Sequence, residues 1–252
     1  MAKLSTYPSL DARTVLITGG ASGIGADLVK AFAQQGCCCV FFDIQDDIGN
    51  DLAKQLGETA FYYRCDLSQT ESLRAMVDTV TEAHGPISVL INNAGNDDRQ
   101  AIDQVDAAYW DWSQSINVKA QFFMAQAVLP SMKSLQQGSI INLSSIAWRI
   151  GIPELAAYAT AKAGILGLTN TLAADFGQFN IRVNAIEPGA VMTEKQRTLW
   201  YPTDDDVQQM VNRQKLNRPI TGDDIARVAL FLAADDSAMI TGQSIRVDAG
   251  FQ

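Results

Sequence analysis

The sequence has a single histidine, His84, and only four cysteines among its 252 residues. One histidine argues against a multi-histidine metal site and, with no G-x-S-x-G turn, against a Ser-His-Asp hydrolase. Three cysteines are adjacent at positions 37–39 and the fourth is Cys65, a spacing that matches neither a disulfide framework nor a metal-binding motif. We therefore expect no metal ion, and we expect buried, reduced thiols in a cytoplasmic protein.

Long apolar runs and positive charge are also scarce. No apolar stretch reaches the eighteen residues or so that a membrane span needs, and residues 1–9 lack the charged-then-apolar order of a signal peptide. The 28 acidic residues outnumber the 19 Lys and Arg residues, which gives a net charge of −9. Because such a chain is repelled by phosphate backbones and anionic lipid, we expect neither nucleic acid nor a membrane as a partner.

Short apolar segments alternate with longer amphipathic ones. Strands are expected at 14–18, 38–43, 60–65, 87–91, 139–143, 181–186 and 244–248, and helices near 23–35, 46–56, 69–84, 103–135, 155–177 and 222–234. Several strand segments, such as VLIT and SIINL, are apolar without alternation, which is typical of parallel strands covered on both faces. The order predicts a doubly wound, Rossmann-type α/β fold: a seven-stranded parallel sheet with helices on both faces, in one domain over residues 1–252.

One segment, 190–220, interrupts this regular order before the last helix and strand. It is polar, yet it carries the adjacent apolar and aromatic residues Leu199, Trp200 and Tyr201. A disordered loop would hardly keep such a cluster, so we interpret the segment as a helical lid that packs over a pocket.

A glycine-rich turn, TGGASGIG at 18–25, joins the first strand to the first helix. Glycine costs conformational entropy on folding, so this turn indicates a close approach to the backbone or positive φ angles. A pyrophosphate at the helix N-terminus would explain it, because the free N–H groups there bind anions.

Asp43 ends the second predicted strand, 18 residues after Gly25, near the spacing at which a carboxylate binds an adenosine ribose. The alternative is that Asp43 caps the helix that starts near Asp46. A carboxylate at this place repels a 2′-phosphate, and Ser22 stands where a basic residue would grip one. The sequence therefore favours NAD over NADP.

Tyr158 and Lys162, in YATAK, follow the fifth predicted strand and its Ser144-Ser145. Their i, i+4 spacing places them on one helix face. An ammonium near a phenol favours the phenolate, which would turn Tyr158 into a usable general base. The alternative is an exposed helix face on which the two side chains have no chemical role.

Taken together, these motifs resemble the short-chain dehydrogenase/reductase family from about residue 10 to 250. The matching pieces are Thr18-Gly19-x-x-x-Gly23-x-Gly25, Asn92-Asn93-Ala94-Gly95, Asn117, Ser145, Tyr158-x-x-x-Lys162 and Pro188-Gly189 followed by Thr193. The resemblance implies that Tyr158 takes the hydroxyl proton while Ser145 holds the same oxygen. It also implies that Lys162 lowers the pKa of Tyr158 and binds the nicotinamide ribose, and that Asn117 holds a water of the proton relay.

The resemblance also implies a dinucleotide site and a neighbouring substrate site. The residues expected at NAD are Gly19, Ser22, Gly23, Ile24, Gly25, Asp43, Ile44, Asp66, Leu67, Asn93, Ala94, Gly95, Tyr158, Lys162, Pro188, Gly189, Val191 and Thr193. The residues expected at the substrate are Asn96, Asp97, Arg99, Ser145, Ala147, Trp148, Arg149, Tyr158, Gln196 and Trp200. The second set is rich in donors and acceptors, with Trp148 as a platform, which suits a polyhydroxylated ring better than a steroid or acyl chain.

Three stretches, NAGNDDR, SSIAW and KQRTLWY, resemble the bacterial aldose 1-dehydrogenases of this family, of the xylose, arabinose and galactose type. The resemblance implies oxidation of C1 of a cyclic sugar to an aldonolactone with NAD. Alternatively, Asp97, Asp98 and Arg99 form an ion-paired surface turn of little energetic weight.

Arg149 supports a separate hypothesis about the substrate. If its guanidinium points into the pocket, it could pair with a sulfonate or carboxylate on the sugar. The alternative is that Arg149 pairs with Glu154 or faces solvent.

The sequence also bears on two alternative functions and on the oligomeric state. A 3-oxoacyl reductase or steroid-type dehydrogenase of the same family would use NADPH or an apolar pocket, which Asp43 and the polar loops disfavour. A non-catalytic dinucleotide-binding regulator should have lost one of Asn117, Ser145, Tyr158 or Lys162, and all four are present. The resemblance implies a homotetramer built through 103–135, 155–177 and the C-terminal strand.

Overall fold

The computed structural model describes residues 4–251. Seven parallel strands form one sheet in the order β3-β2-β1-β4-β5-β6-β7. They are β1 (Thr14–Thr18), β2 (Cys38–Asp43), β3 (Ala60–Arg64), β4 (Ile87–Asn92), β5 (Gly138–Leu143), β6 (Ile181–Pro188) and β7 (Ser244–Val247). The strand order reverses between β1 and β4, so the expected doubly wound parallel sheet is confirmed, as is each expected strand to within two residues at either end.

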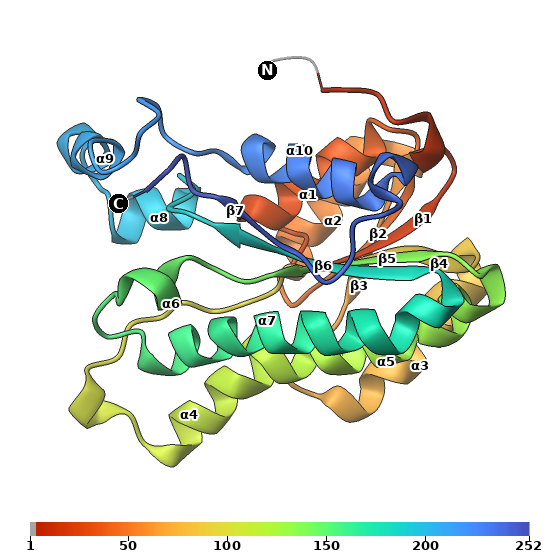
Figure 1. Ribbon diagram of the computed structural model, residues 1–252, viewed down its shortest axis with the longest axis horizontal. Coiled ribbons are helices and arrows are strands. Elements are labelled where there is room, and N and C mark those ends of the chain that lie inside the picture. The colour runs from red at the N-terminus through yellow and green to blue at the C-terminus, as the bar shows by residue number, and fades with distance from the viewer. Residues whose placement is uncertain (1–3, 252) are drawn as a thin grey trace.

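Helices cover both faces of this sheet (Figure 1). One layer holds α1 (Gly23–Ala33), α2 (Asp46–Leu56) and α10 (Gly222–Ala233), and the other holds α3 (Thr70–His84), α4 (Ala107–Gln114), α5 (Ala120–Leu135) and α7 (Ala156–Phe176). The short helices α6 (Ala147–Ile150), α8 (Glu194–Leu199) and α9 (Asp204–Val211) lie together at one end of the sheet.

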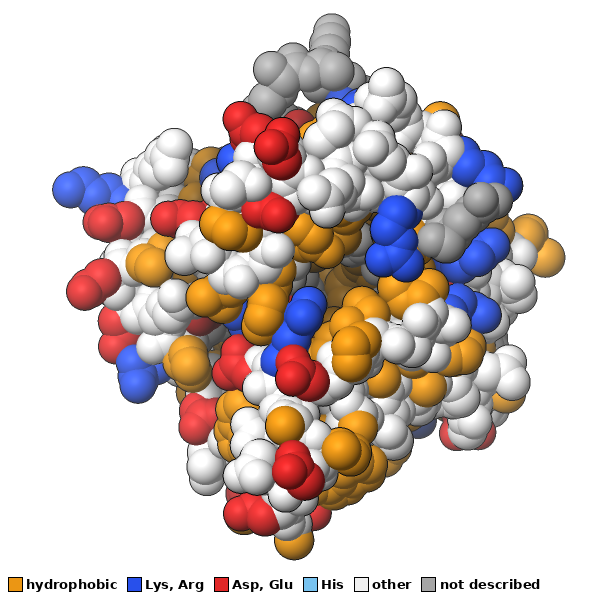
Figure 2. Space-filling view, turned by 90° about the vertical axis from the view of Figure 1, so that its left-hand side faces the viewer, with side chains coloured by type: hydrophobic (Ala, Val, Ile, Leu, Met, Phe, Trp, Pro, Cys, Tyr) orange, Lys and Arg blue, Asp and Glu red, His pale blue; other side chains and the backbone are white. Residues whose placement is uncertain are grey.

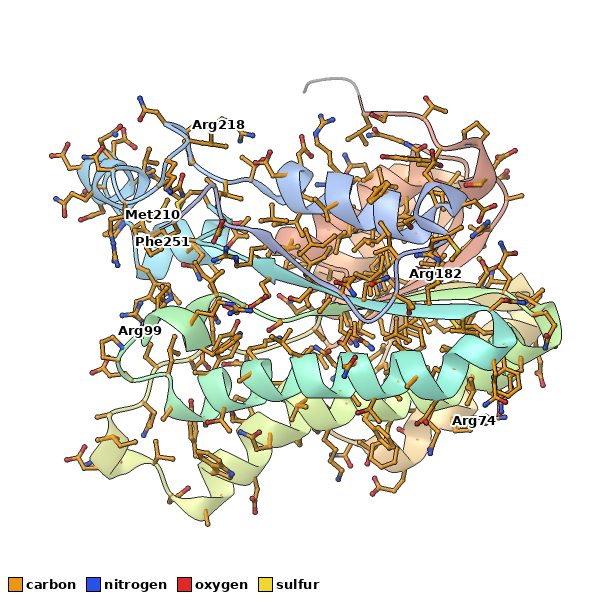
Figure 3. The ribbon with its side chains drawn as sticks, in the orientation of Figure 1. Arg74, Arg99, Arg182, Met210, Arg218 and Phe251 are labelled. Atoms are coloured by element: carbon orange, nitrogen blue, oxygen red, sulfur yellow. The ribbon has the colours of Figure 1, made fainter. Side chains whose placement is uncertain are left out.

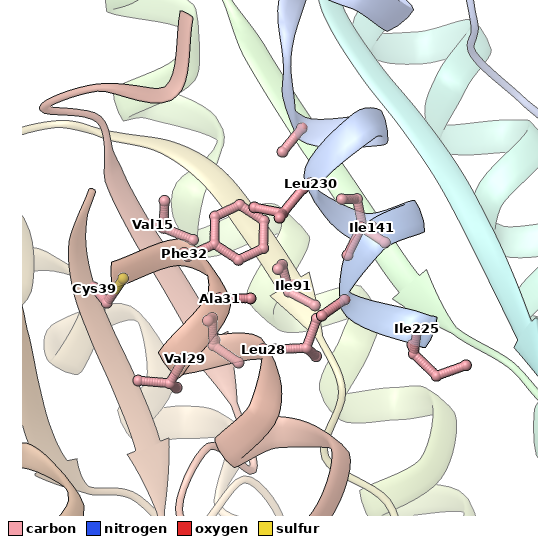
Figure 4. Close-up of a cluster of buried hydrophobic side chains, with 14 of the residues drawn as sticks. Val15, Leu28, Val29, Ala31, Phe32, Cys39, Ile91, Ile141, Ile225 and Leu230 are labelled. Atoms are coloured by element: carbon pink, nitrogen blue, oxygen red, sulfur yellow. The ribbon is translucent and has the colours of Figure 1, made fainter. Parts of the chain in front are cut away.

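Alternating strand residues feed two separate cores. Val15 and Ile17 of β1 pack with α1 and α10, whereas Leu16 between them packs with α3, α5 and α7. Figure 4 shows the first core, where Phe32 of α1 lies against Leu230 of α10. Burial on both faces explains why the strands read as unbroken apolar runs.

The helix expected over 103–135 is wrong as a single element. After a short 3-10 turn (Ile102–Gln104), α4 and α5 are separated by a π-helical turn, Ser115–Lys119. Such a turn inserts one residue into the helical repeat and is frequent at functional sites. Here it carries the buried Asn117.

The cysteines are free thiols, three of them buried and Cys38 half-buried. Burial raises the pKa of Cys37 to about 12 and that of Cys65 to about 11, so both are protonated at neutral pH. Within residues 4–251, no helix has the length and apolar character of a membrane span, and no three His, Cys, Asp or Glu side chains cluster as metal ligands would.

Candidate active site

A cleft of about 1200 Å³ opens at the carboxyl ends of the strands, between the sheet and helices α6 and α8. The space-filling view looks onto this end of the molecule and shows the hollow, with Lys and Arg side chains at its border (Figure 2). Every residue expected at the dinucleotide lines the cleft. Ligands of doubly wound sheets bind at this edge, where the strand order reverses.

The glycine-rich turn is shaped by positions that admit no side chain, Gly19, Gly20 and Gly25. Gly19 has φ +65°, and a Cβ there would come within 2.8 Å of the Ala94 Cα. A Cβ on Gly25 would collide with the Gly19 carbonyl oxygen. Within the described chain, no side chain caps the N-terminus of α1 at Ser22, so its first N–H groups face the cleft as donors for an anion.

Asp43 anchors this turn to the end of β2. Its Oδ2 accepts from the Ala21 N–H at 3.0 Å, and its Oδ1 accepts from the Ile44 and Gln45 N–H groups at 2.8 and 3.1 Å. Helix α2 starts instead from Gln45, without a side-chain cap, so the alternative that Asp43 caps it is wrong. The carboxylate lines the cleft, where an adenosine ribose would reach it.

The end of β4 is fastened to the end of β1. The Asn93 side chain donates to the carbonyls of Thr18 and Gly19 at 3.0 and 2.9 Å, and the N–H groups of Asn93 and Ala94 donate to Thr18 Oγ1 at 3.0 and 3.1 Å. These bonds hold Asn93-Ala94-Gly95 in a fixed position against the glycine-rich turn.

Tyr158 lies at the inner end of the cleft on α7, one helical turn before Lys162. The Lys162 ammonium nitrogen is 5.5 Å from the centre of the phenol ring, and Ser145 hydrogen-bonds the phenol. Burial raises the pKa of Tyr158 well above its usual value, Asp97 raises it further, and the Ser145 bond lowers it. The expected pairing of the three side chains is therefore present.

The expected lowering of the Tyr158 pKa by Lys162 is absent from this structure. Burial lowers the pKa of the Lys162 ammonium to about 8, so this group loses its positive charge in the mildly alkaline range. Its Nζ donates to the Leu143 carbonyl at 2.8 Å and lies over the Tyr158 ring, and it is not among the groups that shift the pKa of Tyr158. The protein's own groups thus leave Tyr158 a weaker acid than a free phenol.

Asn117 lies beneath the cleft rather than in its lining. Its Oδ1 accepts from the Asn96 N–H at 2.9 Å, while its Nδ2 donates to the carbonyls of Asn96 and Ser113, both at 3.0 Å. A Cβ on Gly95 would come within 2.9 Å of Asn117 Oδ1 and 3.2 Å of Lys162 Nζ, so the three groups meet there. Both hydrogens of the Asn117 side-chain amide are donated to carbonyls. The expected water could therefore bind Asn117 only by donating to one of its oxygen atoms.

Trp148 and Arg149 do not line the cleft, and the expectations for both are wrong. The Glu187 carboxylate, fully buried on β6, accepts from the Trp148 indole N–H at 3.1 Å and from Arg149 Nε and Nη2 at 2.7 and 3.0 Å. Ser244 Oγ of β7 donates to Glu187 at 2.5 Å. The Trp148 and Arg149 side chains thus bind the buried carboxylate and lie outside the cleft lining, and Arg149 pairs with Glu187 instead of Glu154.

The loop after β4 is joined to the lid segment across the cleft. Lys195 Nζ of α8 donates to Asp97 and Asp98 at 2.7 and 3.1 Å, and Gln196 Nε2 donates to Asp97 at 3.0 Å. The Arg99 guanidinium lies 3.8 Å from the centre of the Trp200 ring. The ion pairs thus connect two elements instead of forming an isolated surface turn.

Sequence reasoning missed part of the cleft wall. Arg213, after α9, and Phe251, near the C-terminus, both line the cleft, and the Arg213 guanidinium lies 4.5 Å from the centre of the Phe251 ring. The Lys215 and Leu216 N–H groups donate to the Ala249 carbonyl and hold this C-terminal segment against the lid. Arg213 falls inside the predicted lid, but no motif marks it, and Phe251 has no sequence signal.

Known proteins resemble this chain over nearly its whole length. A family model described as enoyl-(acyl carrier protein) reductase matches residues 19–252. A relative from Rhizobium meliloti (strain 1021), named Probable galactose dehydrogenase GalD, is 46% identical over 250 residues, which cover 98% of this chain and 97% of the relative. The D-xylose 1-dehydrogenase of Caulobacter vibrioides (strain NA1000 / CB15N) is 42% identical over 249 residues, 98% of each chain.

A solved structure agrees with these relatives. The crystal structure of a protein from Sinorhizobium meliloti 1021, assigned as a short-chain alcohol dehydrogenase, superposes with a TM-score of 0.87 at 34% identity. The match covers 96% of this chain and 98% of that one.

Proposed function

This chain belongs to the short-chain dehydrogenase/reductase family, and from that premise we propose that it oxidises C1 of a cyclic aldose with NAD. The observation that carries the proposal is the cleft itself, where Tyr158, Ser145 and Lys162 lie at the inner end and the polar residues Asp97 and Gln196 lie nearby. The names of two relatives, a galactose dehydrogenase and a D-xylose 1-dehydrogenase, support a sugar substrate.

The residues of the cleft fit a dinucleotide. The uncapped N-terminus of α1 and the side-chain-free Gly19 and Gly25 leave room and N–H donors for a pyrophosphate. Asp43 provides the acceptor for a ribose hydroxyl and repels a 2′-phosphate. When bound, NAD supplies the nicotinamide ring that accepts the hydride.

The chain's own groups manage the proton and the alignment. The substrate C1 gives up its hydrogen with both bonding electrons, its hydroxyl proton passes to Tyr158, and the C1–O bond becomes the carbonyl of an aldonolactone. This hydrogen, with its two electrons, would be taken up by bound NAD⁺, and Tyr158 would hold the proton, so the electrons balance. Ser145 holds the reacting oxygen, and its own Oγ is fixed by the Ala147 N–H at 3.1 Å.

Because the pKa of Tyr158 is raised in the protein, formation of its phenolate requires a favourable charge that the bound cofactor would supply. Burial and Asp97 both oppose the phenolate. An oxidised nicotinamide carries a positive charge, and a positive charge beside Tyr158 favours the phenolate. We therefore expect proton transfer to Tyr158 to be tied to occupancy by the oxidised cofactor, with Lys162 binding the nicotinamide ribose.

The function is tested by following NADH formation over a panel of neutral and acidic aldoses. Tyr158→Phe should lower kcat by at least about 100-fold, because the general base is lost, and should leave NADH affinity in a fluorescence titration nearly unchanged. The matched control is Tyr63→Phe, whose hydroxyl bonds His84 away from the cleft. Loss of NADH binding with an unchanged rate would contradict the role of Tyr158.

Cofactor choice has its own test. Asp43→Asn should raise the ratio of kcat/KM with NADP to kcat/KM with NAD by about tenfold, because the repulsion of a 2′-phosphate is removed. The control is Asp47→Asn, which removes an exposed carboxylate in the first turn of α2 and should leave that ratio unchanged. An enzyme that prefers NADP before any substitution would contradict the assignment of NAD.

The resemblance also supports a cytoplasmic homotetramer with 190–220 as the lid of one catalytic domain. Trp110 and Phe122, on α4 and α5, are more than a third exposed, which supports a contact between subunits at these helices. Light scattering of the purified protein measures the number of subunits directly.

A further inference from the structure

Two arginines at the outer part of the cleft have aromatic partners and no carboxylate partner. Arg99 lies over Trp200 at 3.8 Å and Arg213 lies over Phe251 at 4.5 Å. In residues 4–251, neither guanidinium has a carboxylate oxygen within 4.0 Å among the ion pairs. Arg99 and Phe251 lie at the same end of the molecule, and Arg74 lies at the opposite end (Figure 3).

The charged side chains at the outer part of the cleft include arginines that no carboxylate pairs. The cations there are Lys195, Arg99 and Arg213, and the lining carboxylates are Asp97 and Glu194. Lys195 is neutralised by Asp97 and Asp98. Within residues 4–251, this opening therefore presents two arginines without ion pairs in a chain of net charge −9, and each of these guanidinium groups attracts anions.

The form of these two side chains suits recognition. A guanidinium stacked on an aromatic ring is held in place by cation–π attraction, while its N–H edges stay available. Those edges match the two oxygens of a carboxylate, sulfonate or phosphate. Arg149 lacks this freedom because Glu187 occupies its Nε and Nη2.

The gradient of burial sets the orientation of a ligand. Lys162 is 2% exposed at the inner end, whereas Arg213 is exposed at the mouth. A sugar whose C1 reaches Tyr158 and Ser145 therefore directs the opposite end of its ring outward.

We propose that Arg99 and Arg213 bind an anionic substituent at the end of the sugar remote from C1, so that the substrate class is an acidic aldose. This inference rests on the proposed sugar 1-dehydrogenase function and narrows it. The shared chemistry is a carboxylate, sulfonate or phosphate on the carbon farthest from C1.

The test compares sugars that differ only at that carbon. Steady-state kcat/KM is measured with NAD for D-galactose against D-galacturonate, and for D-glucose against D-glucuronate, glucose 6-sulfonate and glucose 6-phosphate. We expect at least one acidic sugar to exceed its neutral counterpart by about tenfold or more in kcat/KM, mainly through KM. Raising the salt concentration should reduce this preference, because salt screens the attraction.

Variants assign the preference to the two arginines. Arg99→Gln and Arg213→Gln should each lower the ratio of kcat/KM for the acidic sugar to kcat/KM for its neutral counterpart by about tenfold. Arg213→Lys should recover part of the preference, because it keeps the charge. The matched control, Arg74→Gln, removes an exposed arginine that pairs with Asp78 on α3 and should change neither value.

Each remaining outcome is decisive. If neutral aldoses are oxidised and no acidic counterpart is preferred, the inference is overturned and the proposed function stands. If the arginine variants weaken NADH binding as much as sugar turnover, these arginines serve the cofactor and the inference is overturned. If no aldose of either kind reduces NAD, the proposed function falls and the inference falls with it.

Discussion

Single residues decide the chemistry, and Asp97 is the one with the least obvious role. It lines the cleft, accepts hydrogen bonds from Lys195 and Gln196, and raises the pKa of Tyr158 through its charge. The Asp97 carboxylate thus disfavours the phenolate of Tyr158, the proposed general base. A second role, binding a substrate hydroxyl, would explain why a carboxylate is present at this position, because it would orient the substrate for the reaction.

Replacing Asp97 separates these two effects. Asp97→Asn should shift the rising limb of the kcat/KM pH profile toward lower pH, because loss of the negative charge makes the phenolate easier to form. The measurement is the pH dependence of kcat/KM with a saturating concentration of NAD. The control is Asp98→Asn, which also loses a contact with Lys195 but does not affect the pKa of Tyr158. An identical shift in both variants would show that the effect comes from Lys195.

Several residue roles could be predicted from the sequence because they depend on local spacing. The glycines of 18–25 lie within one loop, and Tyr158 and Lys162 lie one helical turn apart. Residues this close in sequence are also close in the fold, so their proximity follows from the sequence. Arg149 could not be predicted, since its partner Glu187 is 38 positions away and buried. A buried carboxylate binds whichever guanidinium the fold brings to it, and no sequence spacing announces that pairing.

At the scale of elements, helix α8 of the segment 190–220 is connected to the loop after β4 through exposed contacts. Lys195 of α8 is 43% exposed in its side chain and meets Asp97 and Asp98 on the loop after β4. Exposed ion pairs contribute about 0–1 kcal/mol each. Separation of α8 from the loop after β4 therefore costs little free energy, which suits the lid that we propose for this segment.

Hydrogen exchange of backbone amides should detect the contribution of the Lys195 ion pairs to local stability. Lys195→Gln should accelerate exchange of the amides in 194–201 by up to about fivefold, because about 1 kcal/mol of local stability is lost. Exchange in α10 should stay unchanged, as should exchange of both segments in the control Lys54→Gln on α2. Equal protection of 194–201 with and without Lys195 would mean that Trp200 and its neighbours hold the lid without the ion pairs.

Element prediction from the sequence worked for the short apolar segments that are separated by polar turns. Several of the seven strands are continuous apolar runs, and each strand was found. The segment 103–135 was expected as one helix because its apolar pattern does not mark the π turn at 115–119. That turn is stabilised by bonds of Asn117 to Asn96, which lies on another segment.

At the scale of the whole molecule, Glu187 connects three elements. Its carboxylate on β6 accepts from α6 and from β7, and these hydrogen bonds hold its pKa below the ordinary value against the opposing effect of burial. A folded-state pKa below the unfolded one gives stability that is present above the unfolded pKa and is lost as the pH falls through the folded pKa. The bonds around Glu187 should therefore stabilise the fold at neutral pH and not in acid.

Urea unfolding tests this connection. Arg149→Met should reduce the free energy of unfolding at pH 7 by about 2 kcal/mol, less than a fully buried pair would lose, because the Arg149 side chain is 38% exposed. The loss should shrink below pH 4.5, where Glu187 can be protonated. The control Arg74→Met breaks an exposed pair on α3 and should cost under about 0.5 kcal/mol. An equal loss at pH 7 and pH 3.5 would rule out the charge of Glu187 as its cause.

The π turn at Ser115–Lys119 has a consequence for changes of chain length. Deletion of one residue there would let α4 and α5 merge into one regular helix, whereas insertion of a further residue would rotate every residue upstream in α4 by about 100° about the axis. Asn117 would then no longer meet the Asn96 backbone. This short stretch should accept many substitutions on its outer side yet reject any insertion or deletion, which a library of single-codon indels across 100–125 would reveal as a sharp gap.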